Sequence, residues 1–151
     1  MKKEIIYKKA KLDEDTLTQL IDLSYLWEKE DITYGLRHNE KSDLKEPCFI
    51  AIDNNKIVGY VFGEYEVNET HSSFANIGDK FFYISELYVH PLYRNKGIGK
   101  TLYNLIEEEV KDKVDFITLG TATKDYKKIL NFYVDGSGMS VHSSYLFKKI
   151  K

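Results

Sequence analysis

Cysteine is scarce in this chain, and long apolar runs are missing. The 151 residues include one cysteine, Cys48, which excludes an internal disulfide and fits a reducing compartment. No apolar run is long enough to cross a bilayer, and Tyr7-Lys8-Lys9 interrupts the N-terminal segment before an apolar signal core can form. We therefore expect a soluble, cytoplasmic protein.

A basic excess and metal-ligand spacings are also missing. Lys and Arg total 22 against 24 Asp and Glu, for a formal net charge of −2, so nucleic acid is not an expected partner. The four histidines are scattered without the spacing of a metal site, and we expect no metal. A chain of this length with 42% hydrophobic residues predicts a single domain, residues 1–151, with a substantial core.

The apolar pattern predicts an α/β protein with a mixed, mostly antiparallel sheet flanked by helices, in the order β-α-α-β-β-β-α-β-α-β-β. Helices are expected from Asp13 to Trp27, briefly within 28–47, and over Gly99–Val110 and Tyr126–Val134. Strands are expected at Glu4–Ala10, Cys48–Asp53, Ile57–Glu66, Phe81–Val89, Asp115–Gly120, Met139–His142 and Tyr145–Ile150.

The most informative stretch is Arg94-Asn95-Lys96-Gly97-Ile98-Gly99, where a strand leads into a helix. Glycines let a ligand approach the backbone, and the amides of a helix N-terminus attract phosphate. The P-loop pattern fails because it needs glycine where this chain has Arg94. The dinucleotide fingerprint fails because Leu102 occupies its last glycine position. The stretch still predicts a phosphate-bearing ligand.

Together with the preceding 85–91 segment, this stretch resembles the acetyl-CoA signature of the Gcn5-related N-acetyltransferase (GNAT) superfamily. Asn131-Phe132-Tyr133 followed by Gly136–Met139 is similar to a second segment of that family. The resemblance implies the GNAT fold and acetyl transfer from acetyl-CoA to a primary amine, with no metal. It also implies cofactor contacts, mostly through the backbone but with charge from Arg94 and Lys96, by Leu87, Tyr88, Val89, Arg94, Asn95, Lys96, Gly97, Ile98, Gly99, Lys100 and Asn131.

Two residues are the candidate catalytic groups. The resemblance assigns Tyr133 as the general acid that assists the departing CoA thiolate. Glu86 is the best-placed general base, although family members often carry this glutamate at positions matching Tyr83 or Ser85. Strand alternation predicts Ile84, Glu86 and Tyr88 on one face and Tyr83, Ser85, Leu87 and Val89 on the other.

Acidic residues suggest a mouth for a cationic amine, formed by Trp27, Glu28, Glu64 and Glu66, with Glu64 and Glu66 also rivals for the base. The strand end Thr118–Thr121 resembles that of some aminoglycoside 6′-N-acetyltransferases, so the expected substrate is a small cationic molecule of aminoglycoside or polyamine type. The alternatives are a protein or peptide N-acetyltransferase and a non-catalytic acyl-CoA-binding module. The resemblance also allows a homodimer.

Overall fold

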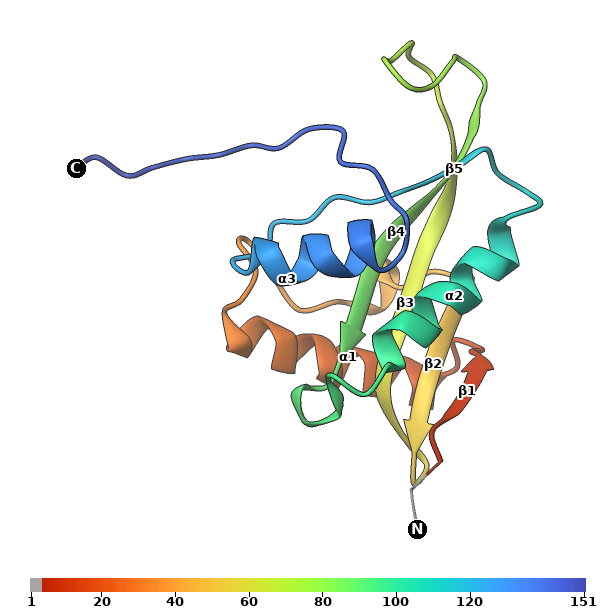
Figure 1. Ribbon diagram of the computed structural model, residues 1–151. Coiled ribbons are helices and arrows are strands. Elements are labelled where there is room, and N and C mark those ends of the chain that lie inside the picture. Colours follow the sequence, from red (N-terminus) through yellow and green to blue (C-terminus); the bar gives the residue numbers. More distant parts are fainter. Residues whose placement is uncertain (1–3) are drawn as a thin grey trace.

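The computed structural model describes residues 4–151 and contains one five-stranded sheet in the order β1-β2-β3-β4-β5 (Figure 1). Strands β1 to β4 are antiparallel, and β5 joins β4 in parallel. The expected α/β class with a mixed, mostly antiparallel sheet is confirmed. The strands are β1 (Ile6–Lys9), β2 (Cys48–Asp53), β3 (Lys56–Val67), β4 (Lys80–Val89) and β5 (Phe116–Thr118).

Helices cover both faces of the sheet. Helix α1 (Glu14–Glu30) begins at Asp13, whose side chain accepts a hydrogen bond from the Thr16 amide at 2.9 Å, and it packs on one face. Helix α2 (Ile98–Val110) packs on the other face, where it buries Leu102 and Ile106 completely. Helix α3 (Tyr126–Leu130) continues into the π-helical turn η3 (Asn131–Asp135), whose Phe132 and Tyr133 pack against this second core.

Strand β4 contains a bulge that reverses the predicted side-chain alternation. Phe62 pairs with Glu86 and the next residue, Gly63, pairs with Ile84, so Ser85 is an extra residue. As a result Ile84 packs in the core under α2, whereas Tyr88 packs in the core under α1. The prediction that Ile84, Glu86 and Tyr88 share a face is therefore wrong, because one inserted residue exchanges the two faces.

Strands β4 and β5 run together over only three residue pairs, from Phe81 with Phe116 to Tyr83 with Thr118. Beyond this point β4 continues to Val89 beside β3 alone, so its other edge lacks a strand partner. Strand β5 is accordingly shorter than the expected Asp115–Gly120. The separation exposes a backbone edge that leads directly toward the 94–99 loop.

The predicted short helix within 28–47 is not formed. Helix α1 extends to Glu30, and the only helical element in the rest of this segment is the three-residue 3₁₀ turn η1 (Lys41–Asp43). Asp31 and Gly35 adopt left-handed backbone conformations, with φ of 52° and 67°, that interrupt a right-handed helix. The segment is a loop that crosses the α1 side of the molecule.

The two predicted C-terminal strands, Met139–His142 and Tyr145–Ile150, are also not formed. Beyond η3 the chain is an extended segment with no strand beside it (Figure 1). It contacts the rest of the protein through His142 beside Ser73 and through Phe147, whose ring meets that of Tyr34 edge-on at 5.4 Å. An apolar sequence supplies side chains for a strand, but a strand needs an adjacent strand edge to satisfy its backbone groups. The segment leaves Tyr145, Leu146, Phe147 and Ile150 between 70% and 95% exposed.

Candidate active site

The loop before α2 leaves a row of backbone amides unpaired. Asn95 and Gly97 adopt left-handed conformations, with φ of 60° and 84°, which turn the chain sharply into α2. Thr101 is the first residue whose amide bonds back, to the Gly97 carbonyl at 3.0 Å. Within residues 4–151, the amides of Gly97 to Lys100 donate to no backbone carbonyl. They lie at the N-terminus of a 13-residue helix, an arrangement suited to binding an anion.

The Arg94 side chain forms its polar contacts with other groups of the protein. Its guanidinium forms a two-point ion pair with Glu30 at 2.7 and 2.9 Å, and its Nε donates to the Val89 carbonyl at 2.9 Å. It also lies 5.3 Å from the centre of the Tyr88 ring. The guanidinium therefore fastens the loop to α1 and β4, and Glu30 offsets the positive charge that Arg94 was expected to add to the cofactor site.

The two lysines of the loop, Lys96 and Lys100, also donate hydrogen bonds to oxygen atoms of the protein. The Lys96 ammonium donates to the Leu92 carbonyl at 3.2 Å. The Lys100 ammonium donates to the Gly136 carbonyl and to the Ser137 hydroxyl, and so ties α2 to the end of η3. The amides, more than the cationic side chains, are what this loop leaves available.

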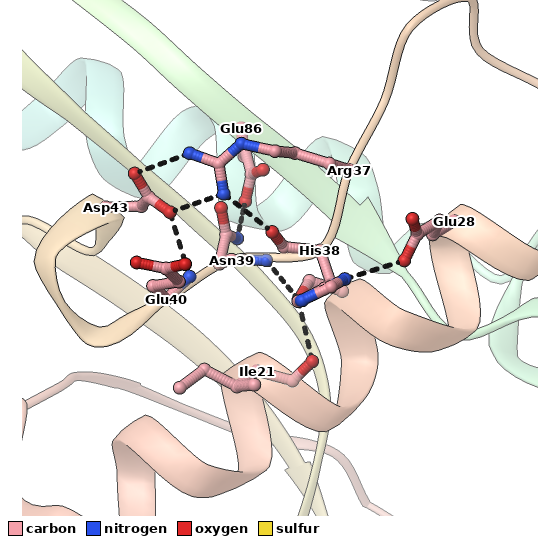
Figure 2. Close-up of polar contacts among 9 residues, drawn as sticks. Ile21, Glu28, Arg37, His38, Asn39, Glu40, Asp43 and Glu86 are labelled. Atoms are coloured by element: carbon pink, nitrogen blue, oxygen red, sulfur yellow. Dashed lines mark hydrogen bonds and ion pairs between the residues drawn. The ribbon is translucent and has the colours of Figure 1, made fainter.

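Glu86 lies at the centre of a polar cluster on the α1 side of the sheet (Figure 2). The Asn39 side-chain amide donates to its Oε2 atom at 2.6 Å, and the Tyr60 hydroxyl donates to the same oxygen at 3.0 Å. Glu86 is half-buried, and this burial raises the pKa of its carboxyl group, against the opposing effect of the two hydrogen bonds. A carboxylate with a raised pKa in a partly open position is suited to proton transfer.

The loop that carries Asn39 is clamped to α1. The Asn39 amide donates to the Ser24 hydroxyl at 2.8 Å, and Ser24 is only 1% exposed. The neighbouring His38 ring stacks on Tyr25 at 3.9 Å and bonds Glu28 through Nδ1 at 2.8 Å. The sequence did not predict that this loop contributes to the site, because no local pattern links Asn39 to Glu86, which lies 47 residues further along the chain.

Tyr133 lies on the opposite side of the sheet from Glu86. Its ring meets that of Tyr103 edge-on at 6.2 Å, within the core under α2. Desolvation raises the pKa of its phenol to about 12. Among the described residues its hydroxyl has no hydrogen-bond partner, and no buried side-chain polar atom is unsatisfied, so this hydroxyl reaches solvent. Asn131, at the start of the same π-helical turn, is exposed.

The expected substrate residues fall into two groups. The Trp27 ring stacks on Tyr88 at 4.9 Å, and Glu28 contacts the loop beside Asn39, so both lie on the α1 side with Glu86. Glu64 and Glu66 are exposed on β3 beyond the bulge, and the structure does not bring them to the cluster around Glu86. The side chains of Leu87 and Val89 pack against the core under α2, which leaves their backbone for ligand contact.

No helix within residues 4–151 is both long and apolar enough to cross a membrane. In the same range, no three His, Cys, Asp or Glu side chains gather as they would around a metal ion.

Comparison with known proteins identifies the family. Residues 14–139 match the sequence model of the Acetyltransferase (GNAT) family. No curated protein matches the chain by sequence. Several solved structures share the fold. An aminoglycoside acetyltransferase from an uncultured soil metagenomic sample, in complex with trehalose, is 19% identical with a TM-score of 0.66, over 97% of both chains.

Two further structures are similar over nearly the whole chain. A predicted acetyltransferase from Clostridium acetobutylicum, solved with acetyl-CoA, is 19% identical with a TM-score of 0.67, over 97% of this chain and 96% of that one. The ribosomal-protein-alanine N-acetyltransferase of Brucella melitensis is 16% identical with a TM-score of 0.64, over 96% of this chain and 99% of that one. The matched family model spans most of the chain, and the chain therefore belongs to the GNAT family and is an acetyl-CoA-dependent acyltransferase.

Proposed function

We propose that this single-domain protein acts in the cytoplasm and transfers an acetyl group from acetyl-CoA to a primary amine of a small cationic molecule. One observation carries the proposal. The edge of β4 that β5 leaves free beyond Tyr83 passes Glu86 and ends at the unpaired amides of Gly97 to Lys100. A candidate cofactor-binding edge and an acid–base group thus lie on β4, and the candidate anion site follows in the loop that connects β4 to α2.

The residues along this edge fit acetyl-CoA, which supplies an activated thioester. The amides around Gly97–Lys100 would hold the pyrophosphate, as helix N-termini do, with Asn95 and Lys96 shaping the loop. The backbone of Leu87, Tyr88 and Val89 would bind the pantetheine arm as an added strand binds a sheet edge. Arg94 contributes by fixing the loop, and the exposed Asn131 amide is a further polar contact for the cofactor.

Glu86 and Tyr133 take separate roles because they lie on opposite faces of the sheet. Glu86 holds the amine on the α1 side and accepts its proton, since only a neutral amine has a lone pair for attack. Tyr133 lies on the α2 side and keeps its phenolic proton across physiological pH, because its pKa is raised to about 12. Its hydroxyl is a hydrogen-bond donor to the sulfur that leaves.

Acidic groups on the α1 side support a cationic acceptor. Glu28 is 38% exposed at the side chain and lies with Trp27 on the face that carries Glu86. The similar soil metagenomic proteins are aminoglycoside acetyltransferases, and one was solved with sisomicin, so aminoglycosides and polyamines are the first acceptors to test. The Brucella protein acts on a ribosomal protein by its name, so peptides with a free N-terminus belong in the same panel.

We also propose that the protein forms a homodimer through its C-terminal arm, residues 139–151. The arm exposes Tyr145, Leu146, Phe147 and Ile150, and the outer edge of β5 has no strand partner. When two copies exchange arms, the arm of one copy can pair its backbone with the open β5 edge of the other and bury its apolar side chains there.

The testing experiment follows CoA release with a thiol reagent. Acetyl-CoA is offered with aminoglycosides, polyamines, amino acids and short peptides, using wild type and Glu86→Gln. We expect turnover with one cationic small-molecule class and a loss of at least tenfold in the variant. Turnover with peptides alone would favour the protein acetyltransferase alternative. Tight acetyl-CoA binding with no turnover on any amine would favour a non-catalytic acyl-CoA-binding module.

A further inference from the structure

The two oxygens of the Glu86 carboxylate are in different surroundings. Both protein donors, the Asn39 amide at 2.6 Å and the Tyr60 hydroxyl at 3.0 Å, bond Oε2. Within residues 4–151, no side chain or amide donates to Oε1. Since no buried side-chain polar atom lacks a partner, Oε1 reaches solvent. One oxygen is anchored and the other is open.

We propose that Asn39 and Tyr60 are positioning residues that anchor Oε2 and thereby aim Oε1 at the acceptor amine. This inference rests on the proposed role of Glu86. An isolated carboxylate on a strand rotates about its terminal bond and presents either oxygen. Two donors that converge on one oxygen remove this freedom. The pair therefore selects which lone pairs receive the proton.

The anchor itself is rigid. Asn39 is 7% exposed, and its backbone amide is held by Ser24, whose hydroxyl in turn donates to the Ile21 carbonyl at 2.7 Å. Figure 2 shows the Asn39 side chain directed from this loop toward Glu86. Tyr60 is completely buried in β3, where the packing of its ring fixes the hydroxyl. Both donors come from groups that pack independently of Glu86.

The anchor also affects the charge of Glu86. Hydrogen bonds to an ionised carboxylate stabilise it, so removing a donor raises the carboxyl pKa further above its ordinary value. Two charged groups of the same loop act on Glu86, since Asp43 raises its pKa and Arg37 lowers it. Further titratable groups on this side include the Glu28–His38 pair, the Glu30–Arg94 pair beside the Tyr88 hydroxyl, and the buried Cys48 thiol. The phenols of Tyr25, Tyr60 and Tyr88 lie there as well.

The test measures the pKa of Glu86 directly, without an acceptor. Protein labelled with ¹³C at the glutamate carboxyl carbons is titrated by NMR, and the Glu86 signal is assigned by its loss in Glu86→Gln. Asn39→Leu and Tyr60→Phe each remove one donor while keeping most of the side-chain volume. We expect each to raise the Glu86 pKa by about one unit, the size of one hydrogen bond to a charged group.

Two controls separate positioning from general loosening of the fold. Asn104→Leu makes the same chemical change on the exposed face of α2 and should leave the Glu86 signal unmoved. His38→Gln, combined with each variant, removes the neighbouring imidazole from the titration. Tyr60→Phe keeps the aromatic ring, so this variant alone can test the effect of a lost donor on the Glu86 pKa if Asn39→Leu fails to fold.

Kinetics with the amine found in the panel gives a second reading. The acid limb of kcat/KM should move to higher pH with the Glu86 pKa, which adds a loss of about tenfold at pH values below the limb. The plateau above the limb should fall as well, because Oε1 is no longer held toward the amine. A merely structural role would lower kcat/KM without moving the acid limb. Unmoved pKa values in both variants would overturn the anchor. Full activity in Glu86→Gln would instead overturn the proposed base, whatever Asn39 does.

Discussion

Arg94 and Glu30 join the cofactor loop to the last turn of α1 through a two-point ion pair at 2.7 and 2.9 Å. The side chains are only 24% and 16% exposed, so each charge depends on the other. We expect Glu30→Gln to destabilise the protein by about 2–3 kcal/mol, because it leaves a half-buried guanidinium with only neutral partners. Acetyl-CoA should also bind more weakly, because the loop loses its support.

Thermal unfolding and acetyl-CoA titration check this prediction. The matched control is Glu108→Gln, which breaks the ion pair with Lys111, where the side chains are 70% and 50% exposed. An exposed pair of this kind is worth less than about 1 kcal/mol. Equal losses of stability in the two variants would show that the Arg94–Glu30 pair has no special structural role.

Gly63 lies beside the β4 bulge, since it pairs with Ile84 on the far side of the extra residue Ser85. A Cβ atom at this position would overlap the Tyr83 carbonyl and the Phe82 ring. We expect Gly63→Ala to cost about 3 kcal/mol or more, because the bulged strand must move. Gly120→Ala is the control, since a Cβ there meets only the Tyr83 hydroxyl at 3.5 Å. Urea unfolding of both variants gives the comparison, and similar midpoints would contradict it.

The sequence predicted the fold where local patterns decide structure. The strands expected at Cys48–Asp53 and Ile57–Glu66 and the helix after the 94–99 motif depend on residues close in sequence, and all three are formed. The helix expected from Asp13 to Trp27 is also formed, with Asp13 as its N-cap. These features follow from backbone preference and apolar spacing alone.

The errors fall where contacts between distant segments decide structure. The bulge at Ser85 is fixed by the pairing of β4 with β3, and the alternation of the sequence carries no sign of it. The anchor of Glu86 comes from Asn39, in a loop whose polar composition resembles any surface loop. Arg94 has the right residue type for a phosphate ligand, and only the fold shows that Glu30 has already engaged it.

Tyr133→Phe should lower kcat by about tenfold or more while leaving stability within about 0.5 kcal/mol of wild type. The hydroxyl has no hydrogen-bond partner among the described residues, so its removal leaves no buried group unsatisfied. The ring contacts with Tyr103 and Phe132 are kept. Steady-state rates test the expected loss of kcat, and thermal melts test the expected stability. A normal kcat would remove Tyr133 from the proposed chemistry.

Glu86→Gln should stabilise the protein above the wild-type Glu86 pKa. The folded state raises the pKa of this carboxyl, so it binds a proton more readily than the unfolded chain, and stability falls as pH rises through this range. Gln accepts the Asn39 and Tyr60 hydrogen bonds through its carbonyl oxygen and places its amide nitrogen at the open position. Melting temperatures compared at pH 4 and pH 8 test this, and the gain should appear mainly at pH 8. A less stable variant at pH 8 would contradict the sign of the shift.

Removal of the C-terminal arm should change the oligomeric state. A chain that ends after Gly138 loses Tyr145, Leu146, Phe147 and Ile150, the most exposed group of large apolar side chains in residues 4–151. Fully extended, the 13 residues of the arm reach about 43 Å, far enough to cross to a second copy. We expect light scattering to give a dimer for the full chain and a monomer for the shortened chain. Tyr145→Ser with Phe147→Ser, which keeps the chain length, should shift the equilibrium the same way. A full-length monomer at all concentrations would show that the arm pairs with no second copy.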